Sequence, residues 1–312
     1  TLDIQGGNLR VNGQIRRSTA TTTGAIKYYQ SGGNVVINGQ GADATALTRA
    51  KLEVVNTGSV FSMSDGTITI VRGSGTSYGD LYLRPASGSV TGGEIIFTQV
   101  PSGWAVADTA QTYRMDASIP LNSLTVTGKT AATAQSATVT LMVNPLVLNG
   151  SLTISNNQSY FDANSSNNLN VSLKGNFTNN GTYRPQLNTT TFNGGTQSIL
   201  GTSTTSFYNL VANPVTSLTM GSSSINVDGN LTLSSGQLLC GSYSVNLKGN
   251  FTNNANYTDN GTGVRLVGAT QQNISGSGTF STLELNNTSG ARLLSSITLN
   301  KDLKLTQGIL NI

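Results

Sequence analysis

Histidine is absent from this sequence of 312 residues, and cysteine occurs once, as Cys240. Without histidine the chain cannot build a Ser-His-Asp triad, and zinc chemistry lacks its usual ligands. A single cysteine excludes an internal disulfide, so packing and hydrogen bonds must stabilise the fold. Cys240 occupies an inward, strand-like position in SSGQLLCGS, and we expect it to be a small buried hydrophobic residue.

Charged residues are also scarce. They make up 10% of the chain, whereas globular domains average about a quarter. The 17 basic and 13 acidic residues give a net charge of +4 without forming a basic stripe, so we expect no nucleic-acid partner. No apolar run approaches the roughly 20 residues that a membrane-spanning helix needs, and we find no signal peptide. Both chain ends lie inside strand-like patterns, so we expect a piece of a longer protein.

Short alternating apolar runs separated by tight turns dominate the sequence. In INVDGNLTL (225–233) the apolar residues occupy every second position on either side of an Asp-Gly-Asn turn. Period two places one face of a strand inside and the other outside. No sustained helical stripe with capping residues appears. The pattern predicts an all-β fold.

The sequence repeats itself. The octet LKGNFTNN occurs at 173–180 and again at 247–254, and a second motif occurs at 146–154, 225–233 and 297–305. The spacing of these copies fits three coils of roughly 20–25 residues each in a parallel β-helix. Tandem β-sandwich domains would instead repeat at about 90–100 residues. Asparagine-rich turns favour stacked coils, because asparagine side chains can form ladders along the stack. We therefore predict a right-handed parallel β-helix, a β-solenoid with degenerate repeats.

The repeat is uneven along the chain. Residues 141–312 carry it clearly and are predicted to form a repetitive β-solenoid. Residues 1–140 keep the strand-and-turn texture with longer strands and more aromatic residues. They are predicted to be either a less regular segment of the same solenoid or a β-sandwich.

A family resemblance covers residues 145–312 well and residues 1–140 weakly. The stretch FNGGTQSILGTSTTSFYNLVANPVTSLTMGSSSINVDGNLTLSSGQL (192–238) resembles the repeats of large surface adhesins of Bacteroidota. The resemblance implies export by type IX secretion, a location on the bacterial cell surface, and a role in adhesion that includes gliding motility. Asp108–Thr109–Ala110 resembles the O-glycosylation motif of such bacteria, which makes Thr109 a candidate acceptor; the plain alternative is a loop.

Parallel β-helices also include polysaccharide lyases and glycosidases, so an enzyme is the alternative to weigh. A glycosidase needs two facing carboxylates, but the thirteen acids are scattered and no Asp-Asp or Asp-x-Asp occurs. A lyase would need Ca²⁺ and a basic residue, for which Asp65, Asp80 and Glu94 are the candidate metal ligands. The simpler interpretation is that these three are solvated turn charges. We expect no enzyme, and no cofactor other than this candidate Ca²⁺.

Glycan binding is the stronger functional prediction. Aromatic side chains on a solenoid face can stack on sugars, and the candidates are Trp104, Tyr160, Tyr183 and Tyr257. Tyr183 and Tyr257 occupy equivalent repeat positions and are expected to align along one side, unless they fill the core. We predict a structural and adhesive segment of a secreted surface protein, whose partners are glycans, solid surfaces or other chains of a cell-surface complex. The alternative is a β-helix that binds or degrades polysaccharide.

Overall fold

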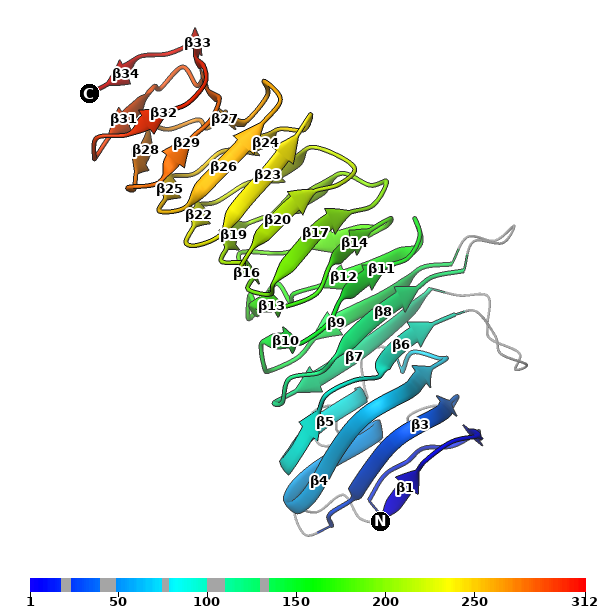
Figure 1. Ribbon diagram of the computed structural model, residues 1–312. Helices are drawn as coiled ribbons and strands as arrows, with labels where there is room; N and C mark the ends of the chain where they lie inside the picture. Colours follow the sequence, from blue (N-terminus) through cyan, green and yellow to red (C-terminus); the bar gives the residue numbers. More distant parts are fainter. Residues whose placement is uncertain (18–23, 40–48, 75–78, 100–109, 130–134) are drawn as a thin grey trace. The chain divides into compact units, whose positions relative to one another are not determined.

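The computed structural model describes residues 1–17, 24–39, 49–74, 79–99, 110–129 and 135–312. Every regular element in these segments is a β-strand (Figure 1). The strands pair in parallel and form stacked sheets, as in a β-solenoid, so the predicted all-β parallel fold is confirmed. None of the described segments forms a helix able to cross a membrane.

The chain divides into two units. The first comprises Thr1–Leu169 with Asn180–Thr182, and the second comprises Asn170–Asn179 with Tyr183–Ile312. The strands of residues 1–140 also pair in parallel. Sandwich domains are instead built from antiparallel sheets.

Three parallel sheets build the second unit, and β15 (Thr182–Arg184) is divided between the two units. Sheet I contains β13 (Val171–Leu173), β16 (Thr189–Phe192), β19 (Asn209–Ala212), β22 (Leu231–Leu233), β25 (Phe251–Asn253), β28 (Gln272–Ser275), β31 (Ala291–Leu293) and β34 (Leu310–Asn311). Sheet II contains β14 (Phe177–Asn179), β17 (Thr196–Leu200), β20 (Ser217–Met220), β23 (Gln237–Gly241), β26 (Asn256–Asp259), β29 (Thr279–Phe280) and β32 (Thr298–Leu299). Sheet III contains β18 (Thr205–Phe207), β21 (Ile225–Val227), β24 (Val245–Leu247), β27 (Val264–Leu266), β30 (Leu283–Asn286) and β33 (Leu303–Gln307).

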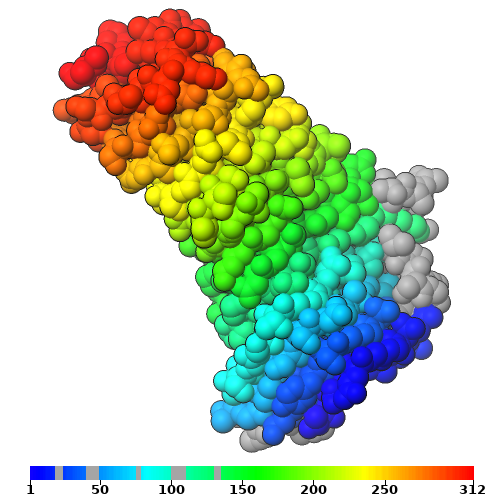
Figure 2. Space-filling model, viewed as in Figure 1, coloured from blue at the N-terminus to red at the C-terminus, as the bar shows by residue number. Residues whose placement is uncertain are grey.

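One coil of the second unit visits the three sheets in turn. Val171 pairs with Thr190 of the next coil, and Leu231 pairs with Phe251 of the next coil, so one coil takes roughly 20 residues. The space-filling view shows the coils of this unit lying directly on one another in chain order (Figure 2). The inward set predicted from period two is confirmed, since Ile225, Val227, Leu231 and Leu233 are buried.

The sequence repeat, however, does not equal three coils. The first octet runs from the end of β13 in sheet I into β14 in sheet II, whereas the second runs from β24 in sheet III into β25 in sheet I. Copies are therefore eleven strands apart, which is three coils and two further strands. The predicted three-coil repeat is wrong, because the same strand–turn–strand unit can form any of the corners.

Asparagine side chains tie successive coils together at the corner between sheets III and I. The Asn209 side-chain oxygen accepts a hydrogen bond from the Asn230 N–H at 2.9 Å. Asn230 in turn accepts from the Asn250 N–H at 2.9 Å, and Asn250 from the Asn273 N–H at 2.8 Å. The predicted asparagine ladder is therefore confirmed, and it satisfies turn amides that strand pairing leaves free.

The first unit winds around three faces with longer strands. Its strands are β1 (Leu2–Ile4), β2 (Asn8–Val11), β3 (Lys27–Ile37), β4 (Ala50–Ile70), β5 (Gly79–Val90), β6 (Glu94–Thr98), β7 (Gln111–Ala117), β8 (Ser123–Thr127), β9 (Ala137–Leu141), β10 (Leu146–Leu148), β11 (Leu152–Ile154) and β12 (Ser159–Asp162). β4 passes through all three faces and bends where Asn56 and Gly66 adopt positive φ of 81° and 86°. Glycine and asparagine tolerate this left-handed conformation best.

The three faces of this unit are defined by the partners of β4. The first face contains residues 50–56 of β4 with the start of β5, followed by β7, β9 and β12. The second face contains β1 and the central part of β4, residues 60–63, with its neighbours in β3 and β5. The third face contains residues 67–70 of β4 with β2, the end of β3, β6, β8 and β11.

Candidate functional site

An outward row of polar and aromatic side chains crosses the second face of the first unit. Asp3 of β1 pairs in register with Tyr29 of β3, which pairs with Ser62 of β4. Ser62 pairs in turn with Ser89 of β5. The neighbouring Tyr28 and Phe61 are fully buried and stack in the core, so period two turns this row outward.

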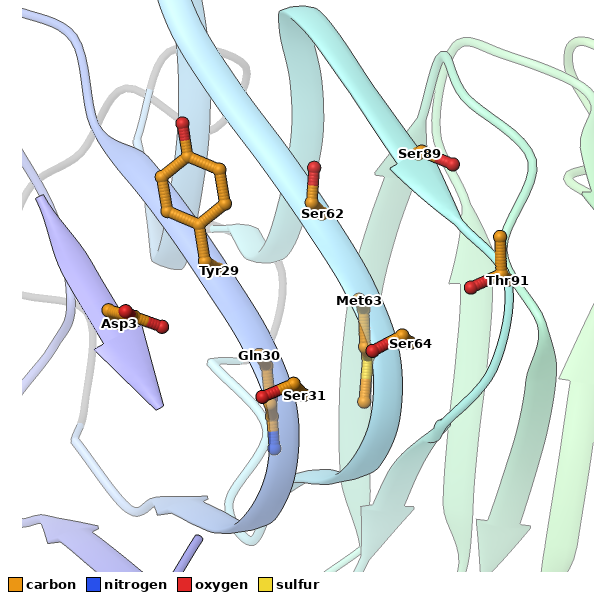
Figure 3. Close-up of a pocket in the computed structure, with 9 residues that line it drawn as sticks. All are labelled: Asp3, Tyr29, Gln30, Ser31, Ser62, Met63, Ser64, Ser89 and Thr91. Atoms are coloured by element: carbon orange, nitrogen blue, oxygen red, sulfur yellow. The ribbon is translucent and has the colours of Figure 1, made fainter. Parts of the chain in front are cut away.

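A hollow of about 230 Å³ opens over this row. Figure 3 shows the Tyr29 ring on the outer side of β3, between Asp3 on one side and Ser62 on the other. The described residues that line the hollow are Asp3, Tyr29, Gln30, Ser31, Ser62, Met63, Ser64, Ser89 and Thr91. Most of them carry hydroxyl groups, which both donate and accept hydrogen bonds. The hollow is smaller than the roughly 300–1,000 Å³ of drug-sized pockets, so it suits one ring of a larger ligand.

Two further hollows continue along the same side of the unit. One of about 230 Å³ shares Ser89 with the first hollow, and one of about 200 Å³ shares Ile119 and Pro120 with the second. The three hollows are neighbours because they share lining residues, and we call them together the second-face groove. A chain-like ligand fits such a groove better than a compact one does.

The second-face groove is equipped for binding. Tyr29 offers an apolar ring and a polar hydroxyl, and Asp3 offers a carboxylate that accepts a hydrogen bond from the Gln5 side chain at 3.2 Å. Hydrolysis of a glycosidic bond usually requires a second carboxylate across the cleft. Among the described residues that line the three hollows, Asp3 is the single carboxylate.

The aromatic residues proposed from the sequence as glycan-binding candidates differ in burial. Trp104 lies outside the described residues, as does the candidate glycosylation site Thr109. Tyr160 lies on β12 and is half-buried. Tyr183 and Tyr257 are only 5% and 1% exposed, so the prediction that they bind glycans along one side is wrong.

Both buried tyrosines belong to aromatic clusters in the core. The Tyr183 ring packs against Phe177 and Phe207, and the Tyr257 ring packs against Phe251 and Phe280. Burial raises the pKa of Tyr183 to about 12. The shared repeat position of the two tyrosines therefore reflects core packing, which was the alternative weighed for them.

The predicted calcium cluster is not formed. Asp80 is fully buried, and its carboxylate lies 3.0 Å from the Lys51 ammonium. Asp65 accepts a hydrogen bond from the Gly66 N–H at 2.7 Å, and Glu94 accepts one from the Thr125 hydroxyl. In the described part of the chain, no group of three or more acidic, cysteine or histidine side chains could hold a metal ion. The three acids do not meet, because Asp80 is buried on the first face whereas Glu94 lies on the third.

Buried charges are a feature of the first face that the sequence did not reveal. The Glu53 carboxylate forms ion pairs with two arginines, with its Oε1 3.2 Å from Arg17 Nε and its Oε2 3.3 Å from Arg49 Nε. All three side chains are buried. Burial lowers the pKa of Lys51 and raises that of Asp80, while the attraction between the two opposes both changes. Desolvating such an ion pair costs folding free energy. Removing one partner also destabilises the fold, because it leaves a buried charge without compensation.

Tyr29 is the site residue that sequence reasoning missed. The signal was present in KYYQ (27–30), because two adjacent tyrosines in a strand must face opposite sides. No family model matches the chain, and no curated protein or solved structure matches it either.

Proposed function

We propose that this chain is a structural and adhesive β-solenoid segment of a large secreted bacterial cell-surface protein, and that it binds glycans along the second-face groove. The observation that carries the proposal is the run of three linked hollows beginning at the outward row of Asp3, Tyr29 and Ser62. The proposal treats the solenoid as a rigid support for this surface.

Stacked parallel strands suit such a support. Successive strands hold their outward side chains about 4.8 Å apart, so the row crossing β1, β3, β4 and β5 has fixed spacing. A ligand that binds to a preorganised row loses less free energy to ordering of the protein.

Sugar rings match the chemistry of the groove. Their hydroxyls can pair with the hydroxyls of Ser62 and Ser89, and their C–H faces can pack on the Tyr29 ring. Ile119 and Pro120 add apolar surface between the second and third hollows. A groove with one aromatic ring, many hydroxyls and one carboxylate favours a neutral polysaccharide.

The cell-surface assignment draws on the sequence. The repeat texture of residues 145–312 resembles adhesins of Bacteroidota that use type IX secretion. Within this proposal, gliding motility is one setting in which a glycan-binding stalk would act.

Affinity electrophoresis against a panel of neutral polysaccharides tests the proposal. We expect Tyr29→Ala to weaken binding about tenfold, because one lost aromatic contact is worth about 1.4 kcal/mol. Tyr208→Ala, a half-buried tyrosine of the second unit, is the matched control and should bind as the parent chain does.

Equal losses for the two variants, or no binding to any neutral polysaccharide, would rule out the second-face groove as a glycan site. Release of soluble sugars during incubation would instead favour the polysaccharide-degrading alternative, which a reducing-end assay would detect.

A further inference from the structure

A separate and larger hollow lies on the first face of the first unit. Its volume is about 480 Å³, within the range of pockets that bury small organic ligands. The described residues that line it are Thr112, Arg114, Thr140, Met142, Val143, Asn164, Ser166 and Asn167. Arg114 of β7 and Thr140 of β9 are paired in register, so their side chains project from the same face side by side.

The charge in the described lining of this hollow is positive. Arg114 is the charged residue among its described lining, which includes no carboxylate. The acids near Arg114 in the sheet already have partners. Asp80 is paired with Lys51 at 3.0 Å and also accepts a hydrogen bond from the Arg114 backbone N–H at 2.8 Å, and Asp116 is paired with Arg84 at 3.4 Å. Asp162, which is in register with Thr140, accepts a hydrogen bond from the Asn164 N–H at 2.8 Å. Among the described residues we find no ion pair for the Arg114 guanidinium, and its buried Nη1 atom has no hydrogen-bond partner.

The turn that follows β12 also lines the hollow, and side-chain amides hold it in place. The Asn164 amide donates to the Leu141 carbonyl at 2.9 Å, and the Asn167 amide donates to the Met142 carbonyl at 3.0 Å. Asn164 adopts a positive φ of 69°, which asparagine tolerates. Because these amides tie the turn to β9, the hollow is shaped before any ligand arrives.

Apolar surface completes the hollow. Met142 lines it beside Val143, whose side chain is 47% exposed although it is large and apolar. An inorganic anion has no apolar group to pack against this surface, whereas a sugar ring can pack its C–H face there. In the adjacent outward row, Thr112 pairs with Thr138, and Thr138 pairs with Tyr160. A ligand that extends from the hollow along this row meets Tyr160.

We infer that this first-face hollow binds an acidic saccharide through a carboxylate or sulfate group on the sugar. A planar guanidinium can bind either group through two parallel hydrogen bonds. Thr112 and Thr140 are placed to donate further hydrogen bonds, while Met142 and Val143 contact the ring. The inference goes beyond the proposed function and stands without it, because it concerns another face and another class of sugar.

Isothermal titration calorimetry at low ionic strength tests the inference with three probes: an oligomer of a hexuronic acid, a sulfated oligosaccharide and a neutral oligosaccharide. We expect the chain to bind at least one acidic probe more tightly than the neutral one. The preferred acidic probe distinguishes carboxylate from sulfate. Added salt should weaken the binding, since screening acts on charge pairs.

Variants then locate the site. Arg114→Gln should weaken binding of the acidic probe roughly ten- to hundredfold, which is the affinity usually lost when a hydrogen bond to a charged group is removed. Arg114→Lys should retain part of the affinity, because lysine keeps the positive charge but cannot form the two parallel hydrogen bonds of a guanidinium. Arg292→Gln removes an exposed arginine of the second unit and is the matched control, expected to change nothing.

The inference is overturned if no acidic probe binds, if the neutral probe binds equally well, or if the two Gln variants lose affinity equally. Should Arg114→Gln fail to fold, Thr140→Val is the second variant, since it removes one hydroxyl and keeps the side-chain shape. Unchanged affinity for the acidic probe in a folded Thr140→Val chain would then count against the site.

Discussion

At the scale of single residues, burial decides the chemistry of Cys240. The thiol is fully buried in β23, as the sequence predicted. Burial, helped by the Asp259 carboxylate, raises the pKa of the thiol from 9.0 to about 12. Thiol reagents attack the thiolate, so this rise lowers the reactive fraction about a thousandfold at pH 8.

We therefore predict that a neutral thiol reagent at pH 8 labels the folded chain far more slowly than the chain unfolded in urea. The raised pKa also favours the folded state below about pH 9, and this stabilisation is lost as the pH rises towards 12. Mass spectrometry measures the labelling, with Cys240→Ala as the control. Equal rates in the folded and unfolded chain would show that the thiol is accessible.

The residues of both proposed sites were partly predictable. Alternation alone shows that Arg114, between the inward Tyr113 and Met115, faces outward. Which outward side chains meet across neighbouring strands depends on the coil length, and residues 1–140 gave no repeat from which to measure it. For the same reason the sequence did not predict the ion pair between Lys51 of β4 and Asp80 of the adjacent strand β5.

At the scale of strands and corners, buried glutamine side chains fasten the turns. Gln272 donates to the Leu247 carbonyl at 3.0 Å and the Gly249 carbonyl at 2.6 Å, and accepts from the Gly268 N–H at 2.9 Å. Gln197 makes the same three kinds of contact eleven strands earlier in the chain. One side chain thus satisfies backbone groups at the same corner of two successive coils.

We predict that Gln272→Met lowers the free energy of unfolding by about 2 kcal/mol or more. The substitution keeps the volume but removes the hydrogen-bond partner of the Gly249 carbonyl and of the Gly268 N–H, each worth about 1–3 kcal/mol when buried. The Leu247 carbonyl suffers less, because it also accepts from the Val267 N–H.

Urea denaturation followed by circular dichroism measures the effect. Gln271→Met is the matched control, since the neighbouring Gln271 side chain is exposed. If both variants unfold at the urea concentration of the parent chain, the corner glutamines do not hold the coils together.

The fold class was predictable at this scale, but the relation between repeat and coil was not. Alternation in INVDGNLTL specifies two strands and a turn, and the structure forms them at β21 and β22. Nothing in that pattern says which sheets the strands join. ITLNKDLKL, the equivalent motif, forms β32 in sheet II and β33 in sheet III. The local sequence encodes one corner, whereas one full coil contains three corners. The sequence period therefore corresponds to a number of strands and need not be a whole number of coils.

At the scale of the whole molecule, each unit behaves as a one-dimensional stack. In the second unit the inner strands pair with the strand one coil before and the strand one coil after, so stability is expected to be a sum of coil and interface terms. Ladders such as Asn209, Asn230, Asn250 and Asn273 add a constraint that single coils lack. Each asparagine must meet the same corner of the next coil.

This constraint distinguishes two deletions in the second unit. Removing residues 225–244 excises one coil and joins Ser224 to Val245, which already stands in register with Ile225. The ladder then passes from Asn209 directly to Asn250. Removing residues 231–236 excises only β22 and its turn, but it moves every later strand to a different sheet and takes Asn250 away from Asn230.

We predict that the one-coil deletion keeps a β-rich circular dichroism spectrum and a urea midpoint close to that of the parent chain. The shorter deletion should lower the midpoint more, although it removes less of the chain, because ladder hydrogen bonds of about 1 kcal/mol each are lost at successive corners. The reverse order of midpoints would mean that corners are fully interchangeable in the folded stack. The asparagine ladder would then follow from the winding of the chain and would not help to set it.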